Sequence, residues 1–337
     1  MPEFKIQVFQ MRANSYLIGV DTGEKMRATS ILQILGSITK QEIDLSEMKS
    51  IYSSIAPHLL DELDGLAEGF SISFHKAAAL FSGYDVPKTE AMGCSSLLTK
   101  DYYVRNYDFS PDLYDGVFSL VQPEQTFASA GYNLQLLGRH DGVNEHGLVA
   151  GLHFVSYDGY RKGVSPWVGI RMVLDTCSSL EEAVALLKEI PHYACYNFSI
   201  GDRNGNIAEV EASPEKVVVR YGESFLSCVN HFQDEQMKRK NRSSIEGSLE
   251  RNKHLLSLNE KQLSHRQLFQ HFKNNESPIF FTDYENLFGT LHTFSYSYHE
   301  SRILTTIAGS KQVLDVNFQD WVNGDDIRGK NLSGNIE

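Results

Sequence analysis

A series of short strand-like segments, separated by tight turns, fills most of the chain beyond residue 94, and this feature restricts the possible folds most. Apolar and polar side chains alternate within these segments, or apolar residues follow one another between turn-forming residues. Strands that follow each other in sequence and are joined by short turns pair as antiparallel neighbours. We therefore expect antiparallel sheets. The expected strands are residues 4–10, 94–98, 102–107, 117–121, 133–138, 148–155, 195–200, 207–212, 217–221, 225–229, 290–298 and 302–306.

Helix-like sequence is gathered in blocks before, between and after these strands. From about residue 45 to residue 81, apolar side chains recur at intervals of three and four residues, and Pro57 fits the first turn of a helix. The pair Ser178 and Glu181 has the spacing of a capping box, which predicts a helix start. Helices gathered in this way are expected to cover the faces of the sheets as layers. Further helices are expected at about residues 167–175, from 178 or 179 to 190, and 234–258.

The composition is that of an ordinary globular protein, and it argues against one class of partner. Of the 337 residues, 41% are hydrophobic and 22% are charged, so the chain can form a core that needs no disulfide or metal. The net charge of −12 argues against a nucleic-acid partner, because binding phosphates requires a basic face. The one dense basic run, residues 238–240 with Arg242, is interpreted as a solvated helix face.

Cysteine and histidine spacing indicates neither a disulfide framework nor a metal site. The four cysteines lie far apart without a CxxC pair, and the 12 histidines show no HExxH spacing. We therefore expect no metal and no cofactor. The first residues show no signal-peptide pattern and no apolar run is long enough to cross a bilayer, so we expect a cytoplasmic protein without a membrane partner. A homo-oligomer is left open.

The pair Gly93–Cys94 is the most informative short motif, because it lies where helical sequence gives way to the first strand of the β-rich part. If the peptide bond before Cys94 were cut, this one residue would provide a thiol nucleophile and, through its freed α-amino group, a base. Gly93 would allow the cut bond to adopt a strained conformation. The alternative is that Cys94 is a small buried hydrophobe, as most cytosolic cysteines are.

Arg105 and Asp108 lie on the strand that is expected to pair with the strand beginning at Cys94. A nearby arginine would lower the pKa of the thiol, and an aspartate would orient the freed amine. The two residues are three positions apart, so a twist or bulge is needed if both are to reach the site. The alternative is an exposed ion pair.

Two later residues complete the set of candidates. Asn230 stands at the end of an apolar strand, where its side-chain N–H groups would suit an oxyanion hole. An asparagine there is equally suited to a turn or a helix N-cap. Arg302 begins a late strand and would suit a substrate carboxylate, although taken alone it is interpreted as structural.

Together these features resemble the choloylglycine hydrolase and penicillin acyltransferase superfamily, whose members are N-terminal-nucleophile hydrolases. The resemblance covers most of the chain and is closer to the acyl-coenzyme A:6-aminopenicillanate acyltransferase branch, which also carries a long segment before a Gly-Cys cleavage point. The motifs that carry the resemblance are residues Met92–Ser96, Arg105–Asp108, Gly142–Leu148, Asp202–Glu211 and Val229–Phe232.

The resemblance implies an α+β fold, a four-layer αββα sandwich of two antiparallel sheets covered by helices. It implies an N-terminal segment of residues 1–93 and a catalytic domain of residues 94–337, which form one globular unit. It also implies autocatalytic cutting and then cleavage or transfer of the acyl group of a linear non-peptide amide through a thioester. The implied partner is a small-molecule acyl amide or acyl donor.

Residue roles follow from the same motif match. The resemblance implies that self-cleavage falls between Gly93 and Cys94 and that Cys94 is the nucleophile and, through its amine, the base. Arg105 and Asp108 would be the site residues of the early strand. Asn230 would be the oxyanion donor. The match of Arg302 to the late arginine of the family rests on its surroundings and not on a tight motif.

One position departs from the pattern of the family. Bile-salt and penicillin V hydrolases carry an asparagine in the strand after the Gly142–Leu148 motif, where this chain has His153. His153 is therefore a possible oxyanion donor or substrate contact, and the bile-salt and penicillin V specificities are in doubt. Two alternatives remain. A Cys–His protease lacks its signature here, whereas an uncut, non-catalytic binding protein of the same fold is distinguished by an intact chain with an unreactive Cys94.

Overall fold

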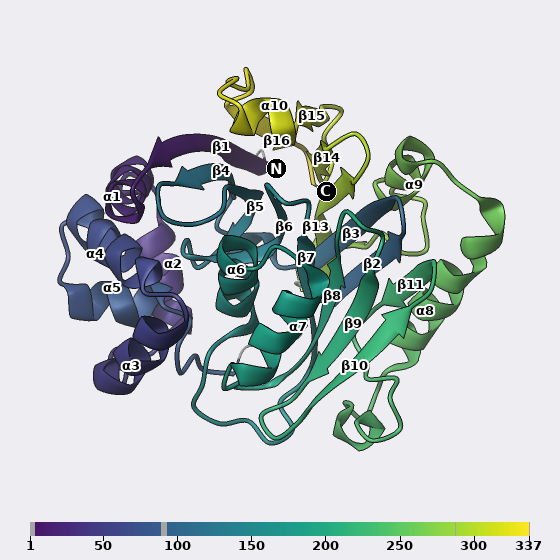
Figure 1. Cartoon of the computed structure of the whole chain (residues 1–337), viewed down its shortest axis with the longest axis horizontal. Helices are drawn as coiled ribbons and strands as arrows, with labels where there is room; N and C mark the ends of the chain where they lie inside the picture. Colours follow the sequence, from purple (N-terminus) through teal and green to yellow (C-terminus); the bar gives the residue numbers. More distant parts are fainter. Residues whose placement is uncertain (1–3, 89–92, 287, 337) are drawn as a thin grey trace.

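The computed structural model describes residues 4–88, 93–286 and 288–336, and in this part of the chain two sheets pack face to face (Figure 1). One sheet has nine strands, in the spatial order β10 (Val217–Gly222), β9 (Ile207–Ala212), β8 (Cys195–Gly201), β7 (Val149–Ser156), β6 (Gly138–Asn144), β5 (Ser129–Leu134), β4 (Val117–Pro123), β1 (Phe4–Ala13) and β16 (Asn331–Gly334). The other has seven strands, β11 (Phe225–Cys228), β2 (Gly93–Thr99), β3 (Tyr102–Phe109), β13 (Phe288–Ser297), β14 (Arg302–Ile307) and β15 (Leu314–Asn317), with β12 (Thr282–Asp283) beside β13.

Helices cover the outer faces of both sheets. The nine-stranded sheet is covered by α6 (Pro166–Thr176) and α7 (Leu180–Glu189), and the seven-stranded sheet by α8 (Glu246–Ser257) and α9 (His265–Phe272). The other helices of the described residues are α1 (Ser15–Met26), α2 (Ile31–Ile38), α3 (Leu45–Ile55), α4 (His58–Phe70), α5 (Phe74–Phe81) and α10 (Phe318–Val322). The predicted α+β sandwich of four layers, helix–sheet–sheet–helix, is therefore confirmed.

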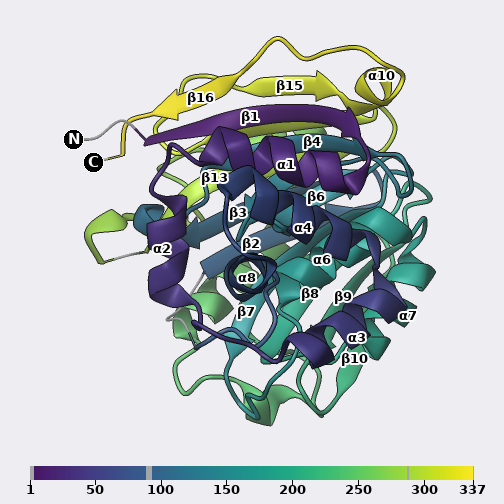
Figure 2. The ribbon, with the colours of Figure 1, turned by 90° about the vertical axis from the view of Figure 1, so that its left-hand side faces the viewer.

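The strand that lies furthest toward the N-terminus is an internal strand of the larger sheet. β1 pairs in parallel with β4 and antiparallel with β16, so two long-range pairings hold it in place. Figure 2 shows β1 and β16 side by side, with α1 and α4 packed below them. The β1–β4 pair is a parallel exception in sheets that were predicted to be antiparallel, because α1 to α5 and the β2–β3 hairpin separate the two strands in sequence.

The predicted strand at residues 133–138 is wrong, because these residues form the end of β5 and the turn into β6. Gln135 and Leu136 have φ angles of 53° and 58°, in the left-handed region that few residues other than glycine adopt. The backbone N–H of Leu136 donates to the Asp115 carboxylate over 2.6 Å, which holds the turn. The turn is buried, so its leucines gave it the apolar appearance of a strand.

Two predicted helix boundaries also differ. The predicted helix 234–258 is α-helical only from Glu246 onward. Before it, Lys238–Lys240 forms a short 3-10 helix, and Lys240 is buried in ion pairs with Asp158 and Glu215, so the predicted solvated helix face is wrong at this residue. The cap of α7 is Ser179, whose hydroxyl accepts from the backbone of Glu182, so the predicted pair of Ser178 and Glu181 is one position early.

No helix within the described ranges combines the length and the apolar character that a bilayer-spanning segment requires.

Candidate active site

Cys94 is the second residue of β2 and lies in the interior of the molecule. In the β2–β3 hairpin it is opposite Tyr107, and Gly93 is opposite Asp108. β11 pairs with the other side of β2, with Cys228 opposite Ser96, so continuing the same register brings residue 230 to Cys94. The side chain of Cys94 is 0% exposed. Met92, the first residue of the motif, lies outside the described residues.

Arg105 contacts the sulfur of Cys94. Strand alternation places both side chains on the face of β2 and β3 that is turned toward the nine-stranded sheet. Arg105 Nη2 donates to Cys94 Sγ over 3.0 Å and to the carbonyl of Leu152 over 2.5 Å, while Nη1 donates to Asp141 over 2.5 Å. Burial raises the pKa of the Cys94 thiol to about 11, although Arg105 lowers it. In the uncut chain the thiol is therefore neutral at pH 7.

Asp108 reaches the other side of the Gly93–Cys94 peptide. Its Oδ1 accepts from the hydroxyl of Thr290 over 2.7 Å, whereas Oδ2 is buried and has no hydrogen-bond partner among the described residues. A Cβ atom at Gly93 would lie 3.0 Å from Asp108 Oδ2 and 2.5 Å from the ring of Phe288, so only glycine allows this close approach. Burial raises the pKa of Asp108. Arg105 and Asp108 thus reach Cys94 and Gly93 from opposite faces of the hairpin, so no bulge between them is needed.

Asn230 binds the backbone nitrogen of Cys94. Its Oδ1 accepts from the Cys94 N–H over 2.8 Å, and its Nδ2 donates to the carbonyl of Phe154 over 2.8 Å. The amide oxygen, and not the expected N–H donor, therefore faces Cys94 in the uncut chain. After a cut before Cys94, the same oxygen would accept from the new α-amino group.

Arg251 is the site residue that sequence reasoning missed. It lies on α8 and donates from Nη1 to the carbonyl of Cys94 over 2.6 Å and to the hydroxyl of Ser95 over 3.0 Å. Its Nη2 donates to Asn230 Oδ1 over 2.9 Å. Nothing in the sequence distinguishes Arg251 from the other basic residues of this polar helix, because its position depends on how α8 packs on the sheet.

His153 lies near Cys94 without contacting its sulfur. Its Nε2 is 3.1 Å from the hydroxyls of both Ser96 and Ser199, and the side chain is fully buried. Burial holds the pKa of His153 well below its usual range, and the charges of Arg105 and Arg251 add to this effect. His153 is therefore neutral and is suited to hydrogen bonding.

The structure does not bring Arg302 to this site. Arg302 is opposite Ser297 of β13, which in turn is opposite Tyr102, at the far end of the hairpin from Cys94. Its side chain is 38% exposed and forms an ion pair with Asp315 over 2.6 Å. The assignment of Arg302 to the site is therefore corrected, and the arginine on the outer face is Arg251.

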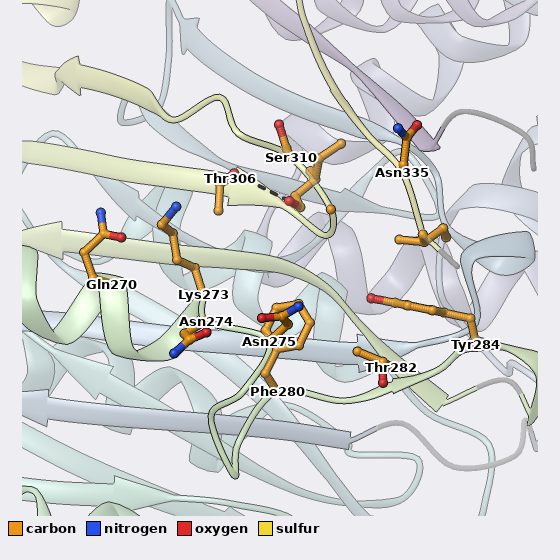
Figure 3. A pocket seen from close by; sticks show the side chains of 13 residues that line it. Gln270, Lys273, Asn274, Asn275, Phe280, Thr282, Tyr284, Thr306, Ser310 and Asn335 are labelled. Atoms are coloured by element: carbon orange, nitrogen blue, oxygen red, sulfur yellow. Dashed lines mark hydrogen bonds between the residues drawn. The ribbon is translucent and has the colours of Figure 1, made fainter.

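A cavity of about 770 Å³ lies on the α9 side of the seven-stranded sheet (Figure 3). None of the residues that contact Cys94 lines it. Its nearest link to the site is Tyr284, which donates to the carbonyl of Thr290, whose hydroxyl binds Asp108. The cavity is therefore separate from the side chains that contact Cys94 in the described residues. It is lined by Gln270, Lys273, Asn274, Asn275, Phe280, Thr282, Tyr284, Thr306, Ile307, Gly309, Ser310, Asn335 and Ile336.

No group of three or more His, Cys, Asp or Glu side chains in the described ranges is arranged to hold a metal ion. The chemical groups around Cys94 are a thiol, two guanidinium groups, a carboxylate and an amide. Together they can stabilise negative charge on sulfur or on a carbonyl oxygen, and they can hold an amine.

The four-layer αββα sandwich, with Gly93–Cys94 at the start of an inner hairpin, agrees with the N-terminal-nucleophile hydrolase fold that the sequence resemblance implied. Within this class the chain belongs to the acyl-coenzyme A:6-aminopenicillanic acid acyl-transferase family, whose sequence profile matches residues 97–312, more than half of the chain.

Several solved structures are similar to the chain. A variant of the conjugated bile acid hydrolase from Clostridium perfringens is 14% identical, over 73% of this chain and 97% of that chain, with a TM-score of 0.43. Penicillin V acylase from Agrobacterium tumefaciens is 17% identical, over 66% and 85%, with a TM-score of 0.38. The N-acylethanolamine-hydrolyzing acid amidase ortholog of Caenorhabditis elegans is 12% identical, over 61% and 93%, with a TM-score of 0.40. No curated protein matched the sequence.

Proposed function

We propose that this protein is a self-processing cysteine enzyme that cleaves or transfers the acyl group of a linear non-peptide amide. The observation that carries the proposal is that three side chains contact three different atoms of Cys94. Asn230 binds its nitrogen, Arg105 its sulfur and Arg251 its carbonyl oxygen. A cysteine with only a packing role would need none of these contacts.

The proposed first reaction is the cut itself. The Cys94 sulfur attacks the carbonyl carbon of Gly93, the C–N bond breaks, and the Cys94 nitrogen leaves as an amine that takes up the thiol proton. Water then hydrolyses the Gly93 thioester, which gives a carboxylate on Gly93 and regenerates the thiol. Asp108, whose unpaired oxygen lies beside Gly93, is placed to orient the attacking water.

The proposed second reaction uses the freed residue. The α-amino group of Cys94, held by Asn230 Oδ1, takes the thiol proton, and the thiolate attacks the acyl carbonyl of the substrate. The leaving amine takes that proton, and a thioester remains on Cys94. Water as the acceptor gives hydrolysis, whereas a second amine gives acyl transfer. Membership of the acyl-transferase family supports acyl chemistry of this kind.

Burial of Cys94 supports the view that the uncut chain is a precursor. The side chain is fully buried and burial raises the pKa of its thiol to about 11, so the thiol is neither accessible to a substrate nor ionised at pH 7. We propose that cutting opens the site, because it separates the Gly93 end of the chain from the nucleophile.

The proposal is tested by the intact mass of freshly purified protein beside a Cys94→Ala variant. We expect two pieces of 93 and 244 residues in the wild type, which together account for the 337-residue chain, and one uncut chain in the variant. Acyl amides are then tested as substrates of the cut protein. A wild-type chain that stays uncut and whose Cys94 does not react would instead favour a binding protein of the same fold.

A further inference from the structure

A network of buried contacts extends from the sulfur of Cys94 through Arg105 and Asp141 to His292. Arg105 binds the sulfur of Cys94, and Asp141 Oδ2 accepts from Arg105 Nη1 over 2.5 Å and from His292 Nε2 over 3.0 Å. The hydroxyl of Tyr114 donates to His292 Nδ1 over 2.6 Å. Because the ionised carboxylate of Asp141 can only accept, the proton of the neutral imidazole is on Nε2, and Nδ1 is left to accept from Tyr114. One carboxylate oxygen therefore orients both a guanidinium and an imidazole.

Aromatic rings pack against His292 and Arg105. The imidazole of His292 stacks on the ring of Tyr132, with centroids 3.7 Å apart and an angle of 14° between the planes. Arg105 lies over the ring of Tyr107, 5.3 Å from its centroid. Asp141 and His292 are 0% exposed, so no solvent competes for their hydrogen bonds.

The charges of Arg105 and Asp141 have opposite effects on the pKa of the Cys94 thiol. The guanidinium of Arg105 lowers the pKa of the Cys94 thiol, whereas the carboxylate of Asp141 raises it. Asp141 itself stays ionised, because His292 and Arg105 outweigh the effect of burial and hold its pKa at about 2. A carboxylate with no role beyond its own charge would therefore hinder formation of the thiolate.

We propose that Asp141, supported by His292, is a positioning residue that holds the guanidinium of Arg105 against the sulfur of Cys94. The inference rests on the proposed function, since the position of Arg105 affects the reaction only if the Cys94 thiolate is the nucleophile. Asp141 acts through Arg105 and touches neither Cys94 nor the peptide that is cut. Loss of Asp141 leaves Arg105 charged but free to turn from the sulfur toward the carbonyl of Leu152, which it already contacts.

The direction in which Asp141→Asn shifts the pKa of the Cys94 thiol tests this inference. If Asp141 positions Arg105, Asp141→Asn raises the pKa of the Cys94 thiol, by about one unit given the usual effect of a neighbouring opposite charge. If Asp141 is only a nearby negative charge, its removal lowers that pKa. The pKa is read from the pH dependence of the rate at which iodoacetamide modifies Cys94, with the modified residue located by peptide mass. The reading is made on the cut protein, because Cys94 is fully buried in the uncut chain.

Two further variants complete the experiment. His292→Gln, which frees Asp141 without removing a charge, should shift the pKa in the same direction by less. Glu62→Gln disturbs a separate buried ion pair, in which Arg171 binds Glu62 over 2.6 Å, and should lower the thermal midpoint of unfolding without shifting the thiol. A lowered or unchanged thiol pKa in Asp141→Asn overturns the inference. If Asp141→Asn does not fold, an unchanged pKa of the Cys94 thiol in His292→Gln overturns the inference.

The intact mass of each sample separates this inference from the function on which it rests. An uncut wild type argues against the proposed processing, whatever the thiol pKa values are. If the wild type is cut but the pKa of the Cys94 thiol does not rise in the variants, only the positioning role of Asp141 is contradicted.

Discussion

Two arginines approach Cys94 from opposite faces of β2. Arg105 comes from between the sheets and reaches the sulfur, and Arg251 comes from the helical layer and reaches the backbone carbonyl. Isolated charges are costly to bury, so each guanidinium is surrounded by acceptors. Asp141 balances Arg105, whereas Arg251 binds neutral oxygens of Cys94, Ser95 and Asn230. The outer arginine is thus available to stabilise negative charge in the proposed reaction.

Arg251 and Arg302 offer a matched pair of substitutions at the residue scale. Arg251→Ala should slow cutting by on the order of 10², because Cys94 and Asn230 lose the donor that orients them. Arg302→Ala should leave the rate of cutting unchanged and alter stability by less than about 1 kcal/mol, since its ion pair with Asp315 is partly exposed. The rate is followed by gel densitometry of newly synthesised protein. Equal effects of the two substitutions would contradict the placement of Arg251 in the site.

Hairpins are the elements that the sequence predicts most securely, and they explain which part of the site was predictable. Cys94, Arg105 and Asp108 come together because β2 and β3 are joined by a short turn, whose register is set locally. Asn230 reaches the site through the pairing of β11 with β2, which only the motif resemblance indicated. Arg251 was missed because its contact depends on the packing of a helix more than 150 residues away in sequence.

Irregular segments with buried polar anchors were the elements predicted least well. The turn at Gln135 and Leu136 is held by Asp115, a residue 21 positions earlier, so no local pattern reveals it. The segment before α8 is held in the same way by Asn241, which bonds both backbone groups of Phe232. In these two segments, hydrogen bonds to residues 9 to 21 positions away hold an irregular backbone where the local periodicity predicted a strand or a helix.

The carboxylates on the inner face of β9 predict a pH dependence of stability. Burial raises the pKa of Glu209 from about 4.5 to about 8, despite its ion pair with Arg220. Because the folded-state pKa is the higher one, the contribution of Glu209 to stability is fully present below about pH 4.5 and is lost as the pH rises through about 8. The loss is at most about 1.4 kcal/mol for each pH unit.

Urea unfolding at pH 5 and pH 8.5 checks this expectation. Glu209→Gln should be less sensitive than the wild type to the rise in pH. The exposed Glu223→Gln provides the control and should follow the wild type. Parallel pH profiles for the wild type and Glu209→Gln would show that Glu209 ionises normally.

At the scale of the whole molecule, the proposed cut divides a structure whose two parts are interleaved. β1 lies between β4 and β16, which both belong to the part after Cys94. His58 and Glu62 of α4 bind Asp175 and Arg171 of α6 in a buried network of ion pairs. The large cluster of buried hydrophobic residues includes side chains from both parts.

The two pieces should therefore remain together after cutting. We expect them to elute from a sizing column in native buffer as one particle that contains equal amounts of each, and to separate only in denaturant. Native mass spectrometry measures this directly. Elution of the 93-residue piece on its own in native buffer would show that the N-terminal segment is released and is not a permanent subunit.

The pairing of β1 with β16 also affects the order in which the molecule can be assembled during its synthesis. Residues 4–7 are synthesised more than 300 residues before their partners, residues 331–334. Until then β1 has an open edge with unpaired backbone groups, which favours association with other strands. A chain that lacks β16 would thus carry the residues that contact Cys94 in the seven-stranded sheet, while the nine-stranded sheet is still open at β1. Translation of β16 therefore closes the edge at which the nascent chain is prone to aggregate.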